Sequence, residues 1–83
     1  MKTTSFQLQR LGKAFKAMRE NRGLTQLEAG ELALIPRLAV IKIEGGRETV
    51  AIGAYSKLAS ALGAEMALMP RTRPTLEELK DFK

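Results

Sequence analysis

The residues that could do chemistry in this 83-residue chain are mainly cations, because the usual catalytic side chains are missing. The sequence contains no cysteine and no histidine. This excludes thiolate nucleophiles, cysteine-ligated zinc and a histidine-dependent triad. Nine carboxylates remain, but no two lie in a pattern that indicates a catalytic pair. We therefore expect a non-enzymatic protein that carries no metal or other cofactor.

The positive charge is concentrated in the N-terminal half of the chain. Fourteen Lys and Arg residues against nine Asp and Glu give a net charge of +5. Residues 1–49 contain nine basic and five acidic side chains, whereas residues 50–83 contain five and four. Such a distribution favours a polyanionic partner such as nucleic acid. The alternative is a solvated surface that happens to be basic, and charge alone leaves both interpretations open.

Four helical segments must position these cations. Apolar residues at helical spacing predict helices over residues 5–21, 25–33, 36–44 and 50–62, with Thr49 as the expected cap of the last. The length indicates one domain, and 45% hydrophobic content with few aromatic residues indicates an aliphatic core. No apolar run approaches the roughly 20 residues of a membrane span, and residues 1–10 lack a signal-peptide core. We therefore expect an untargeted cytoplasmic protein.

The second and third helices are short and closely connected. Thr25 and Glu28 form a Thr-x-x-Glu capping box that starts the second helix. Pro36 suits the first turn of the third helix, and the Gly45-Gly46 pair ends it. Only two or three residues separate the two helices, so they must cross at a steep angle. This arrangement predicts a helix-turn-helix.

A change of period follows the fourth helix. Apolar and other residues alternate from Ala64 to Met69 before Pro70, which predicts a strand. A lone strand in a helical chain requires a partner, and the same strand of a second copy, antiparallel across a twofold axis, would supply it. The alternative is an extended tail. The predicted dimer strand comprises Glu65, Met66, Ala67, Leu68 and Met69.

The helix-turn-helix segment also resembles a known family. The resemblance rests on Arg19-x3-Gly-Leu-Thr-Gln26 followed by Leu32-x2-Ile35-x-Arg37-x2-Val40-x2-Ile43-Glu44-x-Gly46-Arg47. This run looks like the Cro/C1-type (XRE) helix-turn-helix family of transcriptional regulators, over about residues 8–63. The resemblance implies an all-α, lambda-repressor-like domain of four to five helices that binds double-stranded DNA. With the strand, it implies a homodimer on a palindromic operator.

Site residues follow from the matched positions of this family. Arg37, Leu38, Ile41 and Lys42 correspond to recognition-helix positions that approach base edges. A guanidinium has the geometry to contact guanine O6 and N7, whereas the two aliphatic side chains cannot form hydrogen bonds and could pack against a thymine methyl. Phosphate contacts are implied for Gln26, Gly45, Gly46 and Arg47. Arg19 and Glu44 match an internal salt bridge and are assigned to structure.

Three positions depart from the family pattern. Leu34 stands where the family has a turn glycine, and we expect either strain or a remodelled turn. Pro36 replaces a Ser or Thr cap, and Ile41 replaces a mostly polar residue. An apolar recognition helix leaves open that a protein partner covers it. The alternative function is therefore a protein-interaction module that retains the fold and binds little or no DNA.

The layout of the C-terminal third resembles HipB-type antitoxins. The last helix, Gly63 and the predicted strand follow the order seen in those proteins, which repress their own operon and bind a HipA-type kinase toxin. The resemblance implies an autoregulating antitoxin of a type II toxin–antitoxin system. It divides the chain into a DNA-binding domain (1–63), a dimerising strand (64–70) and a C-terminal tail (71–83) that is flexible or binds a partner.

Overall fold

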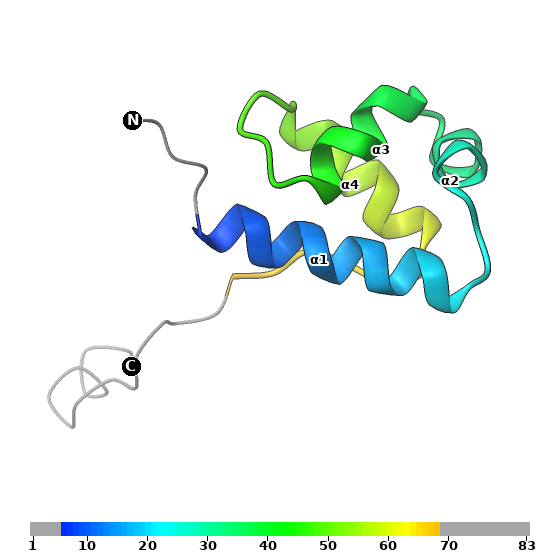
Figure 1. Ribbon diagram of the computed structural model, residues 1–83, viewed down its shortest axis with the longest axis horizontal. Coiled ribbons are helices and arrows are strands. Elements are labelled where there is room, and N and C mark those ends of the chain that lie inside the picture. Colours follow the sequence, from blue (N-terminus) through cyan, green and yellow to red (C-terminus); the bar gives the residue numbers. More distant parts are fainter. Residues whose placement is uncertain (1–5, 69–83) are drawn as a thin grey trace, which may run out of the picture.

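The computed structural model describes residues 6–68 and folds them into four α-helices (Figure 1). They are α1 (Phe6–Asn21), α2 (Gln26–Ala33), α3 (Arg37–Glu44) and α4 (Ile52–Ala61). Each lies within one of the four predicted segments. The predicted all-α class is confirmed for the described residues.

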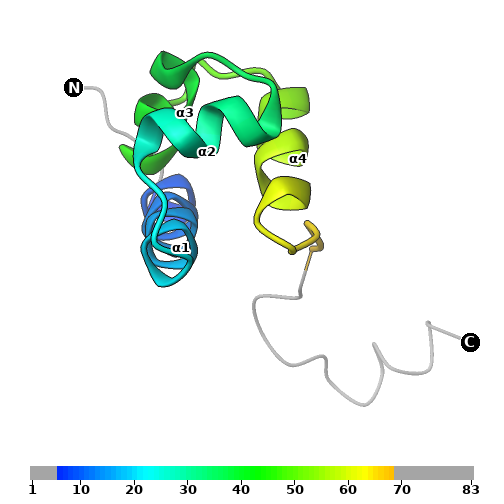
Figure 2. The ribbon, with the colours of Figure 1, turned by 90° about the vertical axis from the view of Figure 1, so that its right-hand side faces the viewer.

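The helices surround one small core. Helix α3 packs on α1, while α2 packs against both α3 and α4. Figure 2 views α1 nearly end-on, with α2 and α3 above it and α4 to one side. The buried apolar side chains are Phe15, Ala29, Ala33, Val40, Ile43, Tyr55, Leu58, Ala59 and Leu62. The Phe15 and Tyr55 ring centroids lie 6.0 Å apart, so the two rings join α1 to α4.

Helices α1 and α3 approach each other to backbone contact. A β-carbon added to Gly12 would lie 2.5 Å from the carbonyl oxygen of Ile43 and 2.7 Å from that of Glu44. Both oxygens belong to the backbone and cannot move aside. Glycine at this position therefore sets the distance between α1 and the C-terminal end of α3.

Helix α2 depends on its cap and on its neighbours. The Thr25 hydroxyl accepts a hydrogen bond from the Glu28 N–H at 3.0 Å, and the Glu28 carboxylate accepts one from the Thr25 N–H at 2.9 Å. The predicted capping box is thus present. An eight-residue helix is not stable alone. The burial of Ala29, Gly30 and Ala33 against the other helices supplies the missing stability.

The turn between α2 and α3 is left-handed at Leu34. This residue has φ 62° and ψ 41°, the conformation that glycine adopts most easily. Its N–H donates to the Glu31 carbonyl, and the Ile35 N–H donates to the Gly30 carbonyl at 2.9 Å. The turn keeps the geometry that the family glycine suggests and is not remodelled, so the leucine adopts a strained backbone.

The start of α4 differs from the prediction. Ala51, not Thr49, occupies the N-cap position, and no side chain caps the helix. The expected Thr49 cap is therefore wrong. The helix begins at Ile52, two residues later than predicted, and residues 45–51 form the connection from α3.

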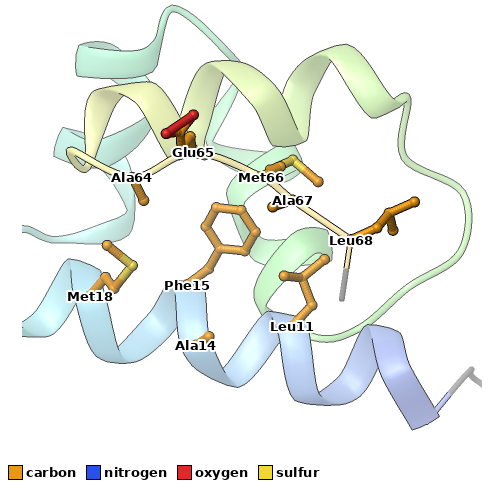
Figure 3. Close-up of a pocket in the computed structure, with 10 residues that line it drawn as sticks. Leu11, Ala14, Phe15, Met18, Ala64, Glu65, Met66, Ala67 and Leu68 are labelled. Atoms are coloured by element: carbon orange, nitrogen blue, oxygen red, sulfur yellow. The ribbon is translucent and has the colours of Figure 1, made fainter. Parts of the chain in front are cut away.

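Residues 64–68 run back along α1 (Figure 3). Leu11, Phe15 and Met18 point from α1 towards this segment, and a groove of about 330 Å³ lies between them. No strand forms within residues 6–68, and the predicted pairing with a second copy stays a prediction. Met69, Pro70 and the predicted tail 71–83 lie outside the described residues.

Candidate nucleic-acid interface

Helix α3 has one buried and one exposed face. Val40 and Ile43 are fully buried against the core. On the opposite side Leu38 and Ile41 are 58% and 38% exposed, and Arg37 is exposed as well. Lys42 is half-buried at the edge of this face. The structure therefore places all four residues predicted to contact bases along the outer side of α3, with two cations beside two aliphatic side chains.

An ion pair fixes the C-terminal end of α3 to α1. Arg19 Nε donates to Glu44 Oε2 at 2.6 Å, and Arg19 Nη2 donates to Oε1 at 3.1 Å. The two side chains are only 10% and 4% exposed, so water screens the pair weakly. The hydrogen bond to Glu44 raises the pKa of Arg19, although burial opposes this shift. The two residues that the resemblance assigned to structure therefore lie together in the interior.

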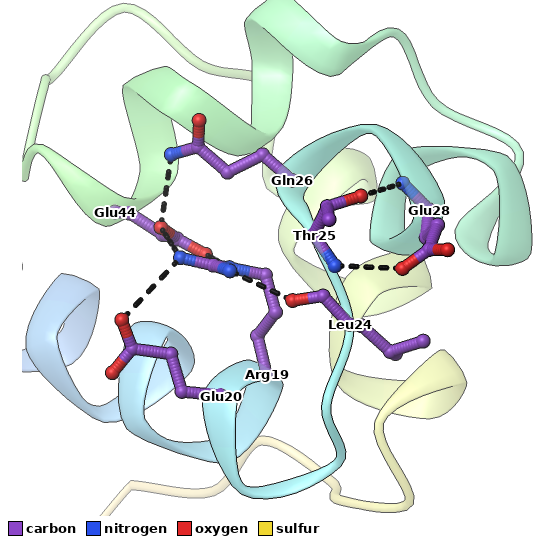
Figure 4. A network of polar contacts seen from close by, with 7 residues as sticks. All are labelled: Arg19, Glu20, Leu24, Thr25, Gln26, Glu28 and Glu44. Carbon is purple, nitrogen blue, oxygen red and sulfur yellow. Dashed lines mark hydrogen bonds and ion pairs between the residues drawn. The ribbon is translucent and has the colours of Figure 1, made fainter.

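The same network extends to α2 and to the turn before it (Figure 4). Arg19 Nη1 donates to the Leu24 carbonyl at 2.8 Å, and Gln26 Nε2 donates to Glu44 Oε1 at 3.1 Å. The amide oxygen of Gln26 points away from Glu44 (Figure 4), as it must, because the opposite orientation would set it against a carboxylate. One carboxylate thus holds α1, α2 and α3 together.

Gln26 forms a contact that was not predicted. One N–H of its amide group donates to Glu44, and the second N–H is left for another acceptor, so the predicted phosphate contact stays a prediction. Sequence reasoning missed the contact with Glu44 because residues 26 and 44 are brought together only by the crossing of α2 and α3. A phosphate at the start of α2 would also meet backbone N–H groups of the first helical turn.

The glycines after α3 also differ from expectation. The Gly45 N–H donates to the Ile41 carbonyl at 3.0 Å, and the Gly46 N–H donates to the Ile43 carbonyl at 3.1 Å. These two amides satisfy the end of the helix and are not free to bind a phosphate. Of the three residues after α3 that were predicted to contact phosphate, only Arg47 has an exposed, positively charged side chain that could bind one.

Tyr55 holds the segment that carries Arg47. Its buried ring packs on Phe15, and its hydroxyl donates to the Arg47 carbonyl oxygen at 3.3 Å. Burial raises the pKa of the Tyr55 phenol. Sequence reasoning missed this hydrogen bond, because it depends on the path of residues 47–51. Tyr55 thereby ties the connection after α3 to α4.

Two shallow hollows border the exposed face of α3. One, of about 500 Å³, is lined by Arg19, Thr25, Gln26, Leu27 and Arg37 at the start of α2. The other, of about 310 Å³, separates α3 from the start of α4. It is lined mainly by apolar side chains, namely Pro36, Leu38, Ala39, Val50, Ala51 and Ala54, with Lys42 and Thr49.

Other types of site lack support within residues 6–68. This part of the chain contains no cluster of three His, Cys, Asp or Glu residues that could bind a metal ion. Among its helices, none is both long enough and apolar enough to cross a bilayer.

The family follows from a direct comparison. The model of a family described as a helix-turn-helix domain matches residues 10–72, which is most of the chain. The chain belongs to this helix-turn-helix family. The membership confirms the recognition made from the motif between Arg19 and Arg47. No curated protein matches the sequence significantly.

Solved structures share the fold. A chain named MDT Protein matches with a TM-score of 0.70 and 22% identity, over 87% of this chain and 99% of the other. A structure of a HipA–HipB–O2–O3 complex matches with the same TM-score, identity and coverage. At this identity the likeness shows a shared fold. It confirms the helix-turn-helix architecture.

Proposed function

We propose that this helix-turn-helix protein is a homodimeric repressor that binds double-stranded DNA at a palindromic operator. The observation that carries the proposal is the outer face of α3, where Arg37 and Lys42 lie beside Leu38 and Ile41 in a helix anchored on its opposite face. A helix with such a face fits the major groove of B-DNA. Arg37 would contact a guanine edge, and Lys42 a guanine or a phosphate.

Phosphate contacts would come from residues near both ends of α3. The exposed Arg47 follows the helix, and Tyr55 holds its backbone. The first turn of α2 offers unpaired N–H groups beside Arg37, at the hollow that both line. Contacts of this kind position a protein on DNA and make its affinity depend on salt, but they do not read sequence.

A second copy of the chain would complete the proposed DNA-binding unit. Leu68 is fully exposed and Met66 is 40% exposed, in the segment that runs along α1. Pairing of residues 64–70 across a twofold axis would cover these side chains. It would also place two copies of α3 in successive major grooves, about 34 Å apart. We propose residues 1–63 as the DNA-binding domain and 71–83 as a partner-binding tail.

We further propose that the protein is an antitoxin that regulates its own operon. One chain of a solved HipA–HipB–O2–O3 complex shares the fold over 87% of this chain. By analogy, a HipA-type kinase toxin would be the protein partner. We assign the chain no catalytic role.

A second candidate function is a protein-interaction module that binds little DNA. The exposed Leu38 and Ile41 favour it, since apolar side chains at the centre of a face are common in protein interfaces.

A mobility-shift titration with DNA from upstream of the protein's own gene separates the two functions. Arg37→Ala is expected to weaken operator binding by roughly 1–3 kcal/mol and to relax preference at one base pair. Lys57→Ala is the matched control, because Lys57 is exposed on α4 beside the end of α2, away from α3. If Arg37→Ala binds with the affinity and base preference of the unmodified chain, Arg37 does not contact a base. If the unmodified chain binds no duplex at low salt, the protein-interaction module is the better assignment.

A further inference from the structure

The centre of the exposed face of α3 is aliphatic. Leu38 and Ile41 are three residues apart and therefore neighbours on the helix surface. Arg37 lies four residues before Ile41, and Lys42 four residues after Leu38. The two aliphatic side chains thus form a strip with a cation on each side. Nothing else in residues 6–68 covers this strip, since Leu38 is 58% exposed and Ile41 38%.

The apolar character continues beside the strip. The hollow between α3 and α4 is bordered by Leu38 and by the apolar side chains of Pro36, Ala39 and Val50. Lys42 lies along the same hollow and is half-buried. A surface of this kind offers van der Waals contact and excludes water, but it cannot donate or accept a hydrogen bond at its centre.

Only one group in the major groove matches such a surface. Guanine, cytosine and adenine present hydrogen-bonding atoms there, whereas thymine also presents its C5-methyl group. A polar base edge placed under Leu38 and Ile41 would lose water without gaining a partner, which is unfavourable. A thymine methyl in the same place would bury apolar surface on both sides.

The flanking charges favour DNA over an apolar protein surface as the occupant of this strip. An apolar protein surface that covers Leu38 and Ile41 would also cover Arg37 and Lys42, and would leave two cations without acceptors. A duplex supplies guanine edges and phosphates at those positions. Given the proposed function, on which this step rests, we infer that each operator half-site places thymine methyl groups under Leu38 and Ile41, between acceptors for Arg37 and Lys42.

The test begins with selection of duplexes from a random pool by the full chain. Each thymidine of the selected duplex is then replaced singly by deoxyuridine, which removes the methyl group and keeps every hydrogen-bonding atom. One or two positions per half-site are expected to bind about fourfold more weakly for each methyl removed, the effect of burying one such group. The other thymidines should show no change.

Variants of the protein link this effect to the strip. With Leu38→Ala, the difference between thymidine and deoxyuridine at the sensitive position is expected to fall towards onefold. Leu32→Ala is the matched control, because Leu32 on α2 is 57% exposed, almost the same as Leu38, and lies outside α3. Leu32→Ala should keep the full fourfold difference.

Three outcomes would overturn the inference, and they are distinguishable. If the selection enriches no duplex, the proposed DNA binding fails as well. If a duplex is selected but deoxyuridine has no effect at any position, DNA binding stands and thymine reading is rejected. If the methyl effect persists in both Leu38→Ala and Ile41→Ala, another part of the chain reads the methyl, and the strip is free for a protein partner.

Discussion

At the scale of single residues, Leu34 carries two costs at once. Its backbone is left-handed, which costs an L-residue roughly 1–2 kcal/mol. Its side chain is 83% exposed, so packing does not offset this strain. The departure from glycine was visible in the sequence. Whether the turn would strain or rearrange was not, because that depends on the hydrogen bonds of Leu34 and Ile35 to the end of α2.

Leu34→Gly is expected to stabilise the fold. The substitution relieves the strain at a positive φ and loses little buried surface, although glycine increases the entropy of the unfolded chain. We expect a net gain of about 1 kcal/mol in the free energy of unfolding. Urea denaturation followed by circular dichroism measures it. Leu32→Gly, inside α2, should destabilise instead, and equal effects of the two changes would contradict the strain.

Tyr55 allows a direct test of burial by titration. It is the sole tyrosine of the chain, so the ultraviolet absorbance of tyrosinate reports it alone. Since burial raises its pKa, the native phenol should ionise above pH 10, its usual value, and at about 10 in urea. Because the folded pKa is the higher one, this group contributes stability that is present below pH 10 and lost as pH rises through the native pKa. Identical midpoints in both states would show that the ring is solvated.

At the scale of elements, one carboxylate organises three helices. Glu44 accepts hydrogen bonds from Arg19 on α1 and from Gln26 on α2 while it ends α3. The family resemblance implied that Arg19 and Glu44 pair, because both residues stand at matched positions of the motif. The part played by Gln26 was not predictable in this way, since it requires the relative positions of all three helices. The use of the Gly45 and Gly46 amides was foreseeable, because the last carbonyls of a helix usually bond the N–H groups that follow.

Loss of one partner of the ion pair should cost more than loss of both. Arg19→Leu leaves the Glu44 carboxylate buried without its cation and is expected to cost about 3 kcal/mol of unfolding free energy. Arg19→Leu with Glu44→Leu should cost less, because no buried charge remains. Chemical denaturation of the single and double variants measures both.

Glu20 provides the control for that comparison. Its Oε2 atom lies 3.9 Å from Arg19 Nη2, and its side chain is 57% exposed. Glu20→Ala should therefore change stability by less than about 0.5 kcal/mol. If Arg19→Leu is no less stable than Arg19→Leu with Glu44→Leu, the buried ion pair does not organise the helices.

At the scale of the whole molecule, the four helices leave one apolar region uncovered at the C-terminal end. Residues 64–68 border the groove along α1, and Leu68 has no cover among the described residues. The alternation of the sequence predicts a strand that pairs with a second copy; residues 64–68 form no strand, and the pairing stays a prediction.

Leu68→Lys tests that prediction. A lysine at this position would place a charge in the proposed interface and shift the protein from twice 9.1 kDa towards 9.1 kDa in sedimentation equilibrium. Leu32→Lys, on α2, should leave the mass unchanged. A mass of 9.1 kDa for the unmodified chain at micromolar concentration would contradict the dimer.

The backbone contact at Gly12 has a genetic consequence. No side chain fits between α1 and the carbonyl oxygens of Ile43 and Glu44. Even alanine at residue 12 would push α3 away from α1 and tilt the exposed face of α3, although Gly12 contacts the opposite, buried side of α3. Given the proposed repressor function, a colony screen for derepressed alleles should find hits at Gly12 as well as at Arg37, and only those at Gly12 should be rescued by second-site changes that let the two backbones separate.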